Sequence, residues 1–417
     1  MFKYLCFLPR FIVIVFIVFC YSLDTSAQDS PSKIALTNAT IIDGINSQPI
    51  QNSNIIITNG KIADIQPNAT EVPSADSVIN LAGRYVLPGY IDAHTHISSL
   101  ETARRALMSG VTTLRTAGSN SYHDVAINNL VKQNKLAGPE IVAAGIFIQP
   151  ELGEDLLADN RFAKFFDGVK SEEQLRKIVQ INIARGAQVI KTRATERAGA
   201  PETDPRKQVY TEKQLRIIVD EASKANIPVM THSHGAEGSL AAVRAGVKSI
   251  EHGTYLDERT IKLMKEQGTY LVPTYTTVKD LTEPGGDYDH PVTTIRGLHM
   301  LPRMEKTVQM AIQKDIDVVA STDSGYGPES INRVTMEAAN FVSLGMSNID
   351  AIRSSTSLAA ELLQVDDHTG QIKEGYDADL VVVERNPLRD IRALQDVIVI
   401  ISNGKIVRNR LPFGITN

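Results

Sequence analysis

Short runs rich in apolar and β-branched residues alternate with amphipathic segments of helix length through the middle of the chain. This alternation is typical of parallel strands joined by helical crossovers, because each crossover returns the chain to the same end of the sheet. The predicted strands are Tyr85 to His94, Val111 to Thr116, Glu140 to Phe147, Gln188 to Arg193, Pro228 to His232, Ser249 to His252, Tyr270 to Tyr275 and Asp317 to Thr322. Eight such runs predict an α/β fold, a (β/α)8 TIM barrel over residues 84–365.

Two capping boxes predict where helices of this barrel begin. Ser171 opens the tetrapeptide Ser-Glu-Glu-Gln before a segment that runs to Arg185, and Thr211 opens Thr-Glu-Lys-Gln in the same way. In each case the hydroxyl and the Gln side chain can satisfy backbone N–H groups of the first helical turn.

The two ends of the chain carry similar segments, from Ile55 to Ile65 and from Val399 to Arg408. Each places β-branched residues around Asn-Gly, a strong hairpin signal because both central residues of the turn need positive φ. We expect the ends to meet in one small β-sandwich, with residues 28–83 as its N-terminal half and 366–417 as its C-terminal half. Two unrelated hairpins are the alternative.

Residues 1–27 have the zones of a secretory signal peptide. Lys3 and Arg10 precede the apolar stretch Phe11 to Leu23, and the small residues Thr25-Ser26-Ala27 follow it. We predict an exported protein, periplasmic or secreted, with no membrane span once the signal is cleaved. An uncleaved anchor is the alternative.

The positions of the cysteines and the net charge limit the kinds of metal site and of binding partner that the chain can have. Cys6 and Cys20 both lie in the predicted signal, so a cleaved chain would hold neither disulfides nor thiolate metal sites. Any metal ion must then be bound by nitrogen and oxygen. The net charge of −5 comes without a basic run, which argues against nucleic acid and favours a small-molecule or short-peptide substrate. The sequence leaves the oligomeric state open, a homo-oligomer included.

Metal-ligand residue types stand at the ends of the predicted strands, where barrels of this kind carry their chemistry. His94 and His96 are two residues apart on one strand, so both face the same side and can bind one ion. The full candidate set is His94, His96, Lys191, His232, His252 and Asp323. His234 lies on the same face as His232, and the spacing alone does not decide which of the two is the ligand.

This set can supply a binuclear hydrolytic site. His94, His96 and Asp323 would bind one divalent ion and His232 and His252 the second, and a shared hydroxide would attack a carbonyl group. Burial and two nearby cations should lower the pKa of Lys191, so that a neutral amine adds carbon dioxide and becomes a bridging carbamate, N6-carboxylysine. The alternative is an ordinary salt-bridged lysine.

Two residues of the set are candidates for acid–base and electrostatic catalysis. Asp323 would accept the proton of the attacking water and return it to the leaving nitrogen, and His234 would stabilise the oxyanion. A helix N-cap is the alternative role for Asp323.

Further residues near the strand ends are candidates for contacts with the substrate. Arg193, with Arg197 after it, is a candidate for binding a substrate carboxylate, and Tyr255 and Tyr275 follow strand tips. A salt bridge or ordinary packing is the alternative for each of them. The stretch from Ile146 to Asp155 has several acidic residues and no histidine, which favours a substrate with a positive charge or none.

The motifs together resemble the amidohydrolase superfamily, in its branch of imidazolonepropionase-like enzymes and Xaa-Pro dipeptidases. The matching segments are Leu87-Pro-Gly-Tyr-Ile-Asp-Ala-His-Thr-His, Ile190-Lys191, Thr231-His-Ser-His-Gly-Ala-Glu-Gly, Ala245-Gly-Val-Lys-Ser-Ile-Glu-His-Gly, Ser321-Thr-Asp-Ser and Gly375-Tyr-Asp-Ala-Asp-Leu-Val. The resemblance implies zinc, a carboxylated Lys191, His232 rather than His234 as ligand, and cleavage of dipeptides, C-terminal residues or N-acyl amino acids.

We therefore predict a binuclear zinc hydrolase that acts on an amide or peptide-like C–N bond. A mononuclear metal-dependent deaminase of the same fold is the first alternative, and it would not need Lys191. A non-catalytic periplasmic metal-binding protein is the second.

Overall fold

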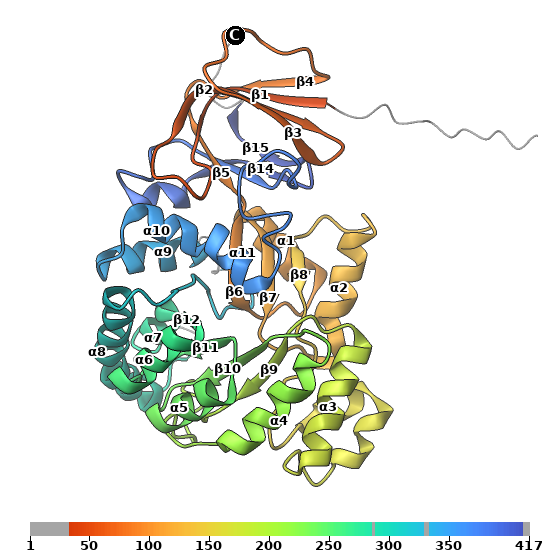
Figure 1. The fold of residues 1–417 in the computed structure, drawn as a ribbon, viewed down its shortest axis with the longest axis vertical. Coiled ribbons are helices and arrows are strands. Elements are labelled where there is room, and N and C mark those ends of the chain that lie inside the picture. The colour runs from red at the N-terminus through yellow and green to blue at the C-terminus, as the bar shows by residue number, and fades with distance from the viewer. Residues whose placement is uncertain (1–32, 286–287, 329–332, 412–417) are drawn as a thin grey trace, which may run out of the picture.

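The computed structural model describes residues 33–285, 288–328 and 333–411. The predicted signal peptide, residues 1–27, lies outside this part of the chain. A β-rich unit built from both chain ends sits on a larger body in which helices surround parallel strands (Figure 1).

Strands from both ends of the chain pair in one eight-stranded sheet of order β15-β14-β13-β5-β1-β2-β3, with β4 paired to β1. They are β1 (Lys33–Ile41), β2 (Ile50–Thr58), β3 (Lys61–Gln66), β4 (Ser77–Asn80), β5 (Tyr85–Pro88), β13 (Leu380–Val383), β14 (Val397–Ser402) and β15 (Lys405–Asn409). The antiparallel pairing of β5 with β13, in which Val86 faces Val382, joins the two ends. The predicted meeting of the ends is confirmed, but the pairing does not divide these strands into the two facing sheets of a sandwich.

The two Asn-Gly turns contact each other inside this unit. Asn59-Gly60 and Asn403-Gly404 all have positive φ, as the hairpin prediction requires. The backbone N–H of Ala378 donates to the carbonyl of Gly60 at 2.8 Å. A Cβ atom on Gly404 would lie 2.5 Å from Cα of Gly60, so the turns can approach this closely only without side chains.

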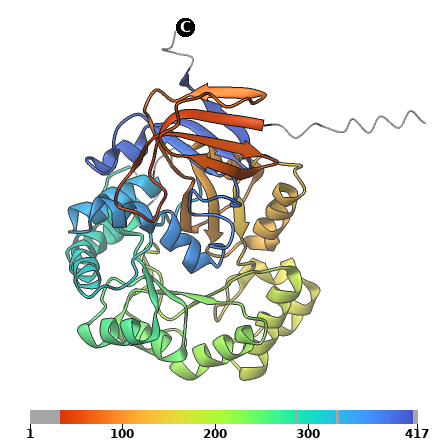
Figure 2. The same ribbon diagram turned by 45° about the horizontal axis from the view of Figure 1, so that its top comes forward.

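The larger body contains two parallel sheets, one of three strands and one of four (Figure 2). The first holds β6 (Tyr90–Thr95), β7 (Val111–Thr116) and β8 (Glu140–Val142), and the second holds β9 (Ile190–Arg193), β10 (Val229–Ser233), β11 (Ser249–His252) and β12 (Tyr270–Val272). Isolated bridges Ile148↔Thr192 and Leu271↔Val318 continue the pairing beyond β9 and β12. The predicted eighth strand, Asp317 to Thr322, is not assigned as a strand, so the described residues form two bridged parallel sheets and not a continuous eight-stranded barrel.

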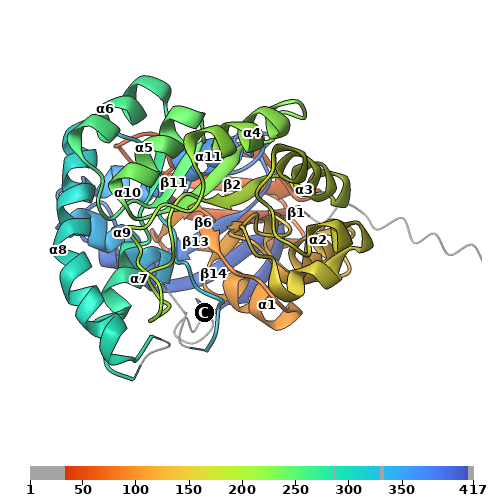
Figure 3. The same ribbon diagram turned by 90° about the horizontal axis from the view of Figure 1, so that it is seen from below.

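Helices lie outside these sheets, as the view from below shows (Figure 3). They are α1 (Leu100–Met108), α2 (His123–Lys132), α3 (Glu172–Arg185), α4 (Glu212–Ser223), α5 (Ala236–Ala245), α6 (Glu258–Gln267), α7 (Tyr275–Asp280), α8 (Pro291–Gln313), α9 (Arg333–Ser343), α10 (Asn348–Ser354) and α11 (Ser357–Leu363), with 3-10 turns η1 (Asn120–Tyr122), η2 (Gly153–Ala158), η3 (Asn160–Phe165) and η4 (Ile391–Gln395). Both predicted capping boxes are confirmed, at Ser171 with Gln174 and at Thr211 with Gln214. Within the described ranges, no helix has the length and apolar character needed to span a bilayer.

Candidate active site

The predicted ligands converge on one cavity of about 320 Å³ at the C-terminal ends of the parallel strands. Its polar side is lined by His94, His96, Lys191, His232, His234, His252 and Asp323. These residues come from β6, β9, β10, β11 and the segment after Val318, so segments far apart in sequence build one face. Parallel strands bring their carboxyl ends to the same edge, which explains the convergence.

Asp323 connects the two histidines of β6. Its Oδ1 lies 3.3 Å from Nε2 of His94 and 3.1 Å from Nε2 of His96. The backbone holds this arrangement, because the N–H of Asp323 donates to the carbonyl of His94 at 2.7 Å and Asp323 adopts φ of 47°. Burial raises the pKa of Asp323, but the charge of His94 and the hydrogen bonds from His94 and His96 outweigh it, so the pKa lies well below the usual range. An ionised carboxylate therefore faces two imidazoles.

A buried ion pair fixes the orientation of His94. Its Nδ1 lies 2.6 Å from Oε2 of Glu251, and Arg115 donates to both oxygens of that carboxylate at 3.1 and 3.2 Å. Burial raises the pKa of Glu251, but the charge of Arg115 and the His94 hydrogen bond outweigh it and lower the pKa to about 2. An ionised Glu251 accepts from Nδ1–H, so a metal ion at this site would take Nε2 of His94, in place of the contact that this atom makes with Asp323.

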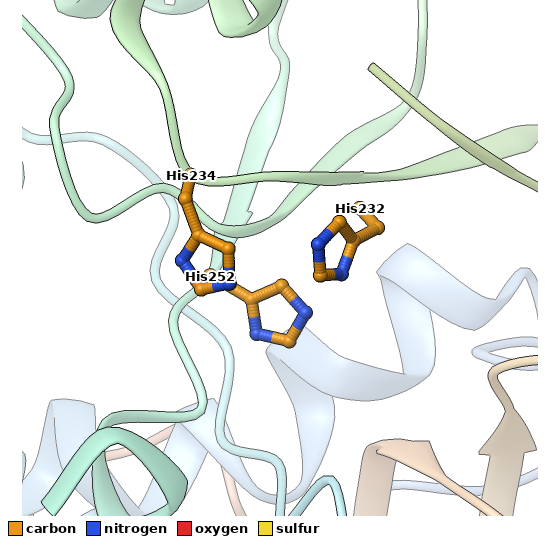
Figure 4. Close-up of side chains that lie close together, drawn as sticks. All are labelled: His232, His234 and His252. Carbon is orange, nitrogen blue, oxygen red and sulfur yellow. The ribbon is translucent and has the colours of Figure 1, made fainter. Parts of the chain in front are cut away.

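Three further histidines cluster beside this group (Figure 4). His232, His234 and His252 each offer a nitrogen within 4.8 Å of the others, and the rings of His234 and His252 stack with centroids 4.7 Å apart. The structure therefore brings both His232 and His234 to the site and does not select one of them as ligand. A second possible cluster joins His94, His252 and Asp323, so His252 is common to both.

One ring nitrogen of each of these three imidazoles contacts an oxygen atom of the protein. Nε2 of His232 lies 3.0 Å from the carbonyl of Glu196, while Nδ1 of His234 and of His252 lie 2.9 and 2.7 Å from the hydroxyls of Thr254 and Thr274. Burial lowers the pKa of all three histidines, to about 3 for His234 and well below the ordinary value for the others. Neutral imidazoles are the form that binds metal ions.

Lys191 is 2% exposed, and its Nζ has no hydrogen-bond partner in the described part of the chain. Burial and the charges of Arg115 and Arg193 lower its pKa to about 8, against the attraction of Glu251 and Asp323. An unpartnered ammonium group is costly to bury. The donor set thus fits divalent ions bound by nitrogen and oxygen. Lys191 lines the same cavity with no hydrogen-bond partner among the described residues for its Nζ, which lies 5.5 Å from the centroid of the Phe147 ring.

The rest of the cavity lining, called the wall below, is mostly apolar. It is lined by Ala117, Phe147, Arg197, Ala198, Gly199, Ala200, Thr277, Val278, Leu281 and Tyr288. Sequence reasoning did not single out Tyr288, Val278 and Leu281, because all three lie well beyond the end of β12 at Val272, in α7 or in the segment between α7 and α8. Polar residues at the ends of predicted strands do not indicate which residues of the following segment line the cavity.

Of the predicted substrate-contact residues, Arg193, Tyr255 and Tyr275 do not line this cavity. Arg193 donates to Gln149 and lies over the ring of Phe147, with 4.7 Å from its Cζ to the ring centroid. The hydroxyl of Tyr275 donates to Glu305 at 3.0 Å. Arg197 does line the cavity, whereas the acidic residues between Ile146 and Asp155 do not.

Comparison with known proteins gives consistent matches. The model of the amidohydrolase family matches residues 85–407. An ochratoxinase of Aspergillus niger is 26% identical over 419 residues, covering 89% of this chain and 85% of that protein. An imidazolonepropionase of Kosmotoga olearia is 24% identical over 402 residues, covering 86% of this chain and 91% of that enzyme.

Solved structures agree with these matches. A Xaa-Pro dipeptidase with methionine bound in its active site is similar with a TM-score of 0.82 and 28% identity, covering 91% of this chain and all 100% of that one. The ochratoxinase structure from A. niger has a TM-score of 0.78 and 25% identity, covering 93% and 98%. The family resemblance read from the motifs is confirmed.

Proposed function

Because the chain belongs to the amidohydrolase family, we propose that it is an exported, zinc-dependent hydrolase of amide or peptide-like C–N bonds. The observation that carries the proposal is the convergence of seven predicted ligand and catalytic side chains on one cavity. The similar ochratoxinase and Xaa-Pro dipeptidase support amide-bond hydrolysis as the reaction class.

The residues suit two divalent ions. His94, His96 and Asp323 would bind one, His232 and His252 the other, and a carbamate on Lys191 would bridge them. Ions bound there supply a lowered pKa for water and polarisation of the substrate carbonyl. We propose zinc because imidazole and carboxylate groups are common zinc ligands, and hydrolytic zinc sites are built from them.

The protein's own groups would move the protons. Asp323 is ionised and faces the cavity, so its carboxylate can accept a proton from the attacking water and deliver it to the leaving nitrogen. His234 is neutral, and its Nδ1 contacts the hydroxyl of Thr254. When that hydroxyl donates to Nδ1, the other ring nitrogen carries hydrogen and can donate to the developing oxyanion.

The charge and apolar character of the wall indicate which substrate groups it could contact. Arg197 offers a guanidinium with no hydrogen bond or ion pair among the residues described, and its neighbours in the lining are apolar. Two ion pairs, Glu196 with Lys207 and Asp204 with Arg206, occupy other charges of the same loop. An N-acyl amino acid or short peptide with an apolar side chain and a free carboxylate would match this wall.

The direct test is a hydrolysis screen of the zinc-loaded mature protein against N-acyl amino acids, Xaa-Pro dipeptides and lactams. We expect turnover of at least one carboxylate-bearing amide, loss of turnover on chelation, and recovery on adding zinc. Hydrolysis of an amidine-type carbon by protein with one metal per chain would favour the deaminase. Metal binding without turnover of any of these compounds would favour the non-catalytic alternative.

A further inference from the structure

One arginine on α8 binds four backbone carbonyls of the loop that forms the substrate side of the cavity. Arg296 donates through Nη1 to the carbonyls of Ala198 and Ala200, the latter at 2.8 Å. Through Nη2 it donates to Pro201 at 3.2 Å and to Thr203. The planar fork of a guanidinium is suited to such multiple donation, which a lysine ammonium cannot reproduce in the same geometry.

The loop residues held in this way are cavity-lining residues. Ala198, Gly199 and Ala200 all face the cavity. Gly199 also contacts the Tyr288 ring, because a Cβ atom at position 199 would lie 2.6 Å from Cε1 of Tyr288. The loop and Tyr288 therefore fit together only while position 199 has no side chain.

The next residue of the same helix fixes a second part of the wall. A Cβ atom on Gly297 would lie 2.7 Å from Cβ of Leu281, which lines the cavity after α7. A single turn of α8 thus contacts both the loop 198–203 and the Leu281 region. The hydrogen bonds that hold the histidines do not involve this turn, because their partners are Glu251, Thr254, Thr274 and the carbonyl of Glu196. The charge of Arg296 does reach the site, since it contributes to the lowered pKa of His234.

We propose that Arg296 is a positioning residue that holds the loop 198–203 as a preformed wall and so determines which acyl or side-chain groups the cavity accepts. The inference rests on the proposed hydrolase function for its kinetic consequences. Its structural part, that the order of the loop 198–203 depends on the Arg296 guanidinium, does not rest on the proposed function.

The experiment compares Arg296→Gln and Arg296→Lys with the matched control Arg303→Gln in full-length mature, zinc-loaded protein. Arg303 is exposed on the same helix and donates to the carbonyl of His299 within that helix. Amide hydrogen exchange is measured for the loop 198–203 and for β10 and β11. Kinetics are measured with N-acetylalanine and N-acetylphenylalanine, and binding of N-acetylphenylalanine is measured by calorimetry.

For Arg296→Gln we expect faster exchange in the loop but not in β10 or β11, unchanged metal content, and a KM or Kd for N-acetylphenylalanine raised by roughly tenfold. We also expect kcat within about twofold of wild type and a smaller difference between the two substrates. Arg296→Lys should fall between Arg296→Gln and wild type, and Arg303→Gln should match wild type.

Unchanged loop exchange, an unchanged KM and Kd, or a wild-type-like Arg296→Lys would overturn the inference. So would a fall in kcat at constant KM. If the wild-type protein hydrolyses neither compound but turns over another amide of the screen, that amide replaces them in the kinetics. If it hydrolyses no amide of the screen, the proposed function is contradicted, whereas the exchange and calorimetry results still decide the role of Arg296.

Discussion

The ligand residues of the cavity and its apolar wall differ in what holds their side chains. On the ligand side, the histidines follow parallel strands and are bonded to buried groups such as Glu251, itself 0% exposed and paired with Arg115. On the wall, short loops and α7 present small and apolar residues, and the loop is held by backbone carbonyls bonded to Arg296. The strands thus position the ligand side chains, and the loops and α7 form the wall that a substrate would contact.

This comparison predicts that changes on the ligand side alter turnover or metal binding, whereas changes on the wall alter substrate affinity. Variants of each side test the division.

The largest effect is expected for Asp323→Asn. An amide cannot accept the proton of water, so kcat should fall by roughly 10²- to 10⁴-fold, the range for a general acid–base group. Steady-state kinetics with metal analysis check this, and Asp317→Asn, at the exposed opposite end of the same segment, is the control. Near-normal turnover in Asp323→Asn would remove this residue from proton transfer.

Lys191→Met should reduce bound zinc from two ions per chain to one and abolish most turnover, because the proposed bridging carbamate is lost. Metal content measured by mass spectrometry of the purified protein checks the stoichiometry. The exposed Lys213→Met on α4 should keep both ions. Two ions retained in Lys191→Met would show that the lysine does not bridge them.

Glu251→Gln should weaken metal binding by about 10- to 100-fold, as expected when the partner of a ligand histidine is lost. It also leaves Arg115 as a buried unpaired cation, so the free energy of unfolding should fall by roughly 3–5 kcal/mol. Zinc titration and urea denaturation measure the two effects. The exposed Glu258→Gln is the control, and equal behaviour of both variants would contradict the proposed orientation of His94.

The smallest change is expected from the wall. Arg197→Gln should raise KM roughly 10- to 100-fold for N-acetylphenylalanine, because a hydrogen-bonded charge pair is lost. The KM for N-acetylphenethylamine, the same molecule without the carboxylate, should stay constant, as should kcat for both. Arg206→Gln in the same loop serves as control. An equal change in KM for both compounds would mean that Arg197 does not recognise the carboxylate.

The difference between the two regions also explains which features sequence reasoning could reach. Polar residues at strand ends mark the ligand side, because the strand period places His94 and His96 on one face. The Asn-Gly turns and the helix N-caps at Ser171 and Thr211 can also be predicted from the sequence, since each depends on local backbone chemistry. The ion pair of Glu251 with Arg115 cannot be predicted in this way, because the two residues are far apart in sequence and only the folded chain brings them together.

Other features depend on the whole fold. The contact of Tyr288 with Gly199 and the four carbonyl bonds of Arg296 join loops whose shapes no periodic pattern specifies. The eighth predicted strand fails for a related reason. The backbone of Ala320 donates to Ser354, outside the neighbouring strands, and only Val318 forms a bridge.

The central claim is that two metal ions share the cavity through a modified Lys191, and anomalous diffraction tests it most directly. Crystals of the zinc-loaded protein should be measured on both sides of the zinc absorption edge. We predict two zinc peaks, one beside His94, His96 and Asp323 and one beside the His232 and His252 side chains, joined by density for a carbamate on Lys191. A single peak, or an unmodified lysine pointing away from both, would contradict the account.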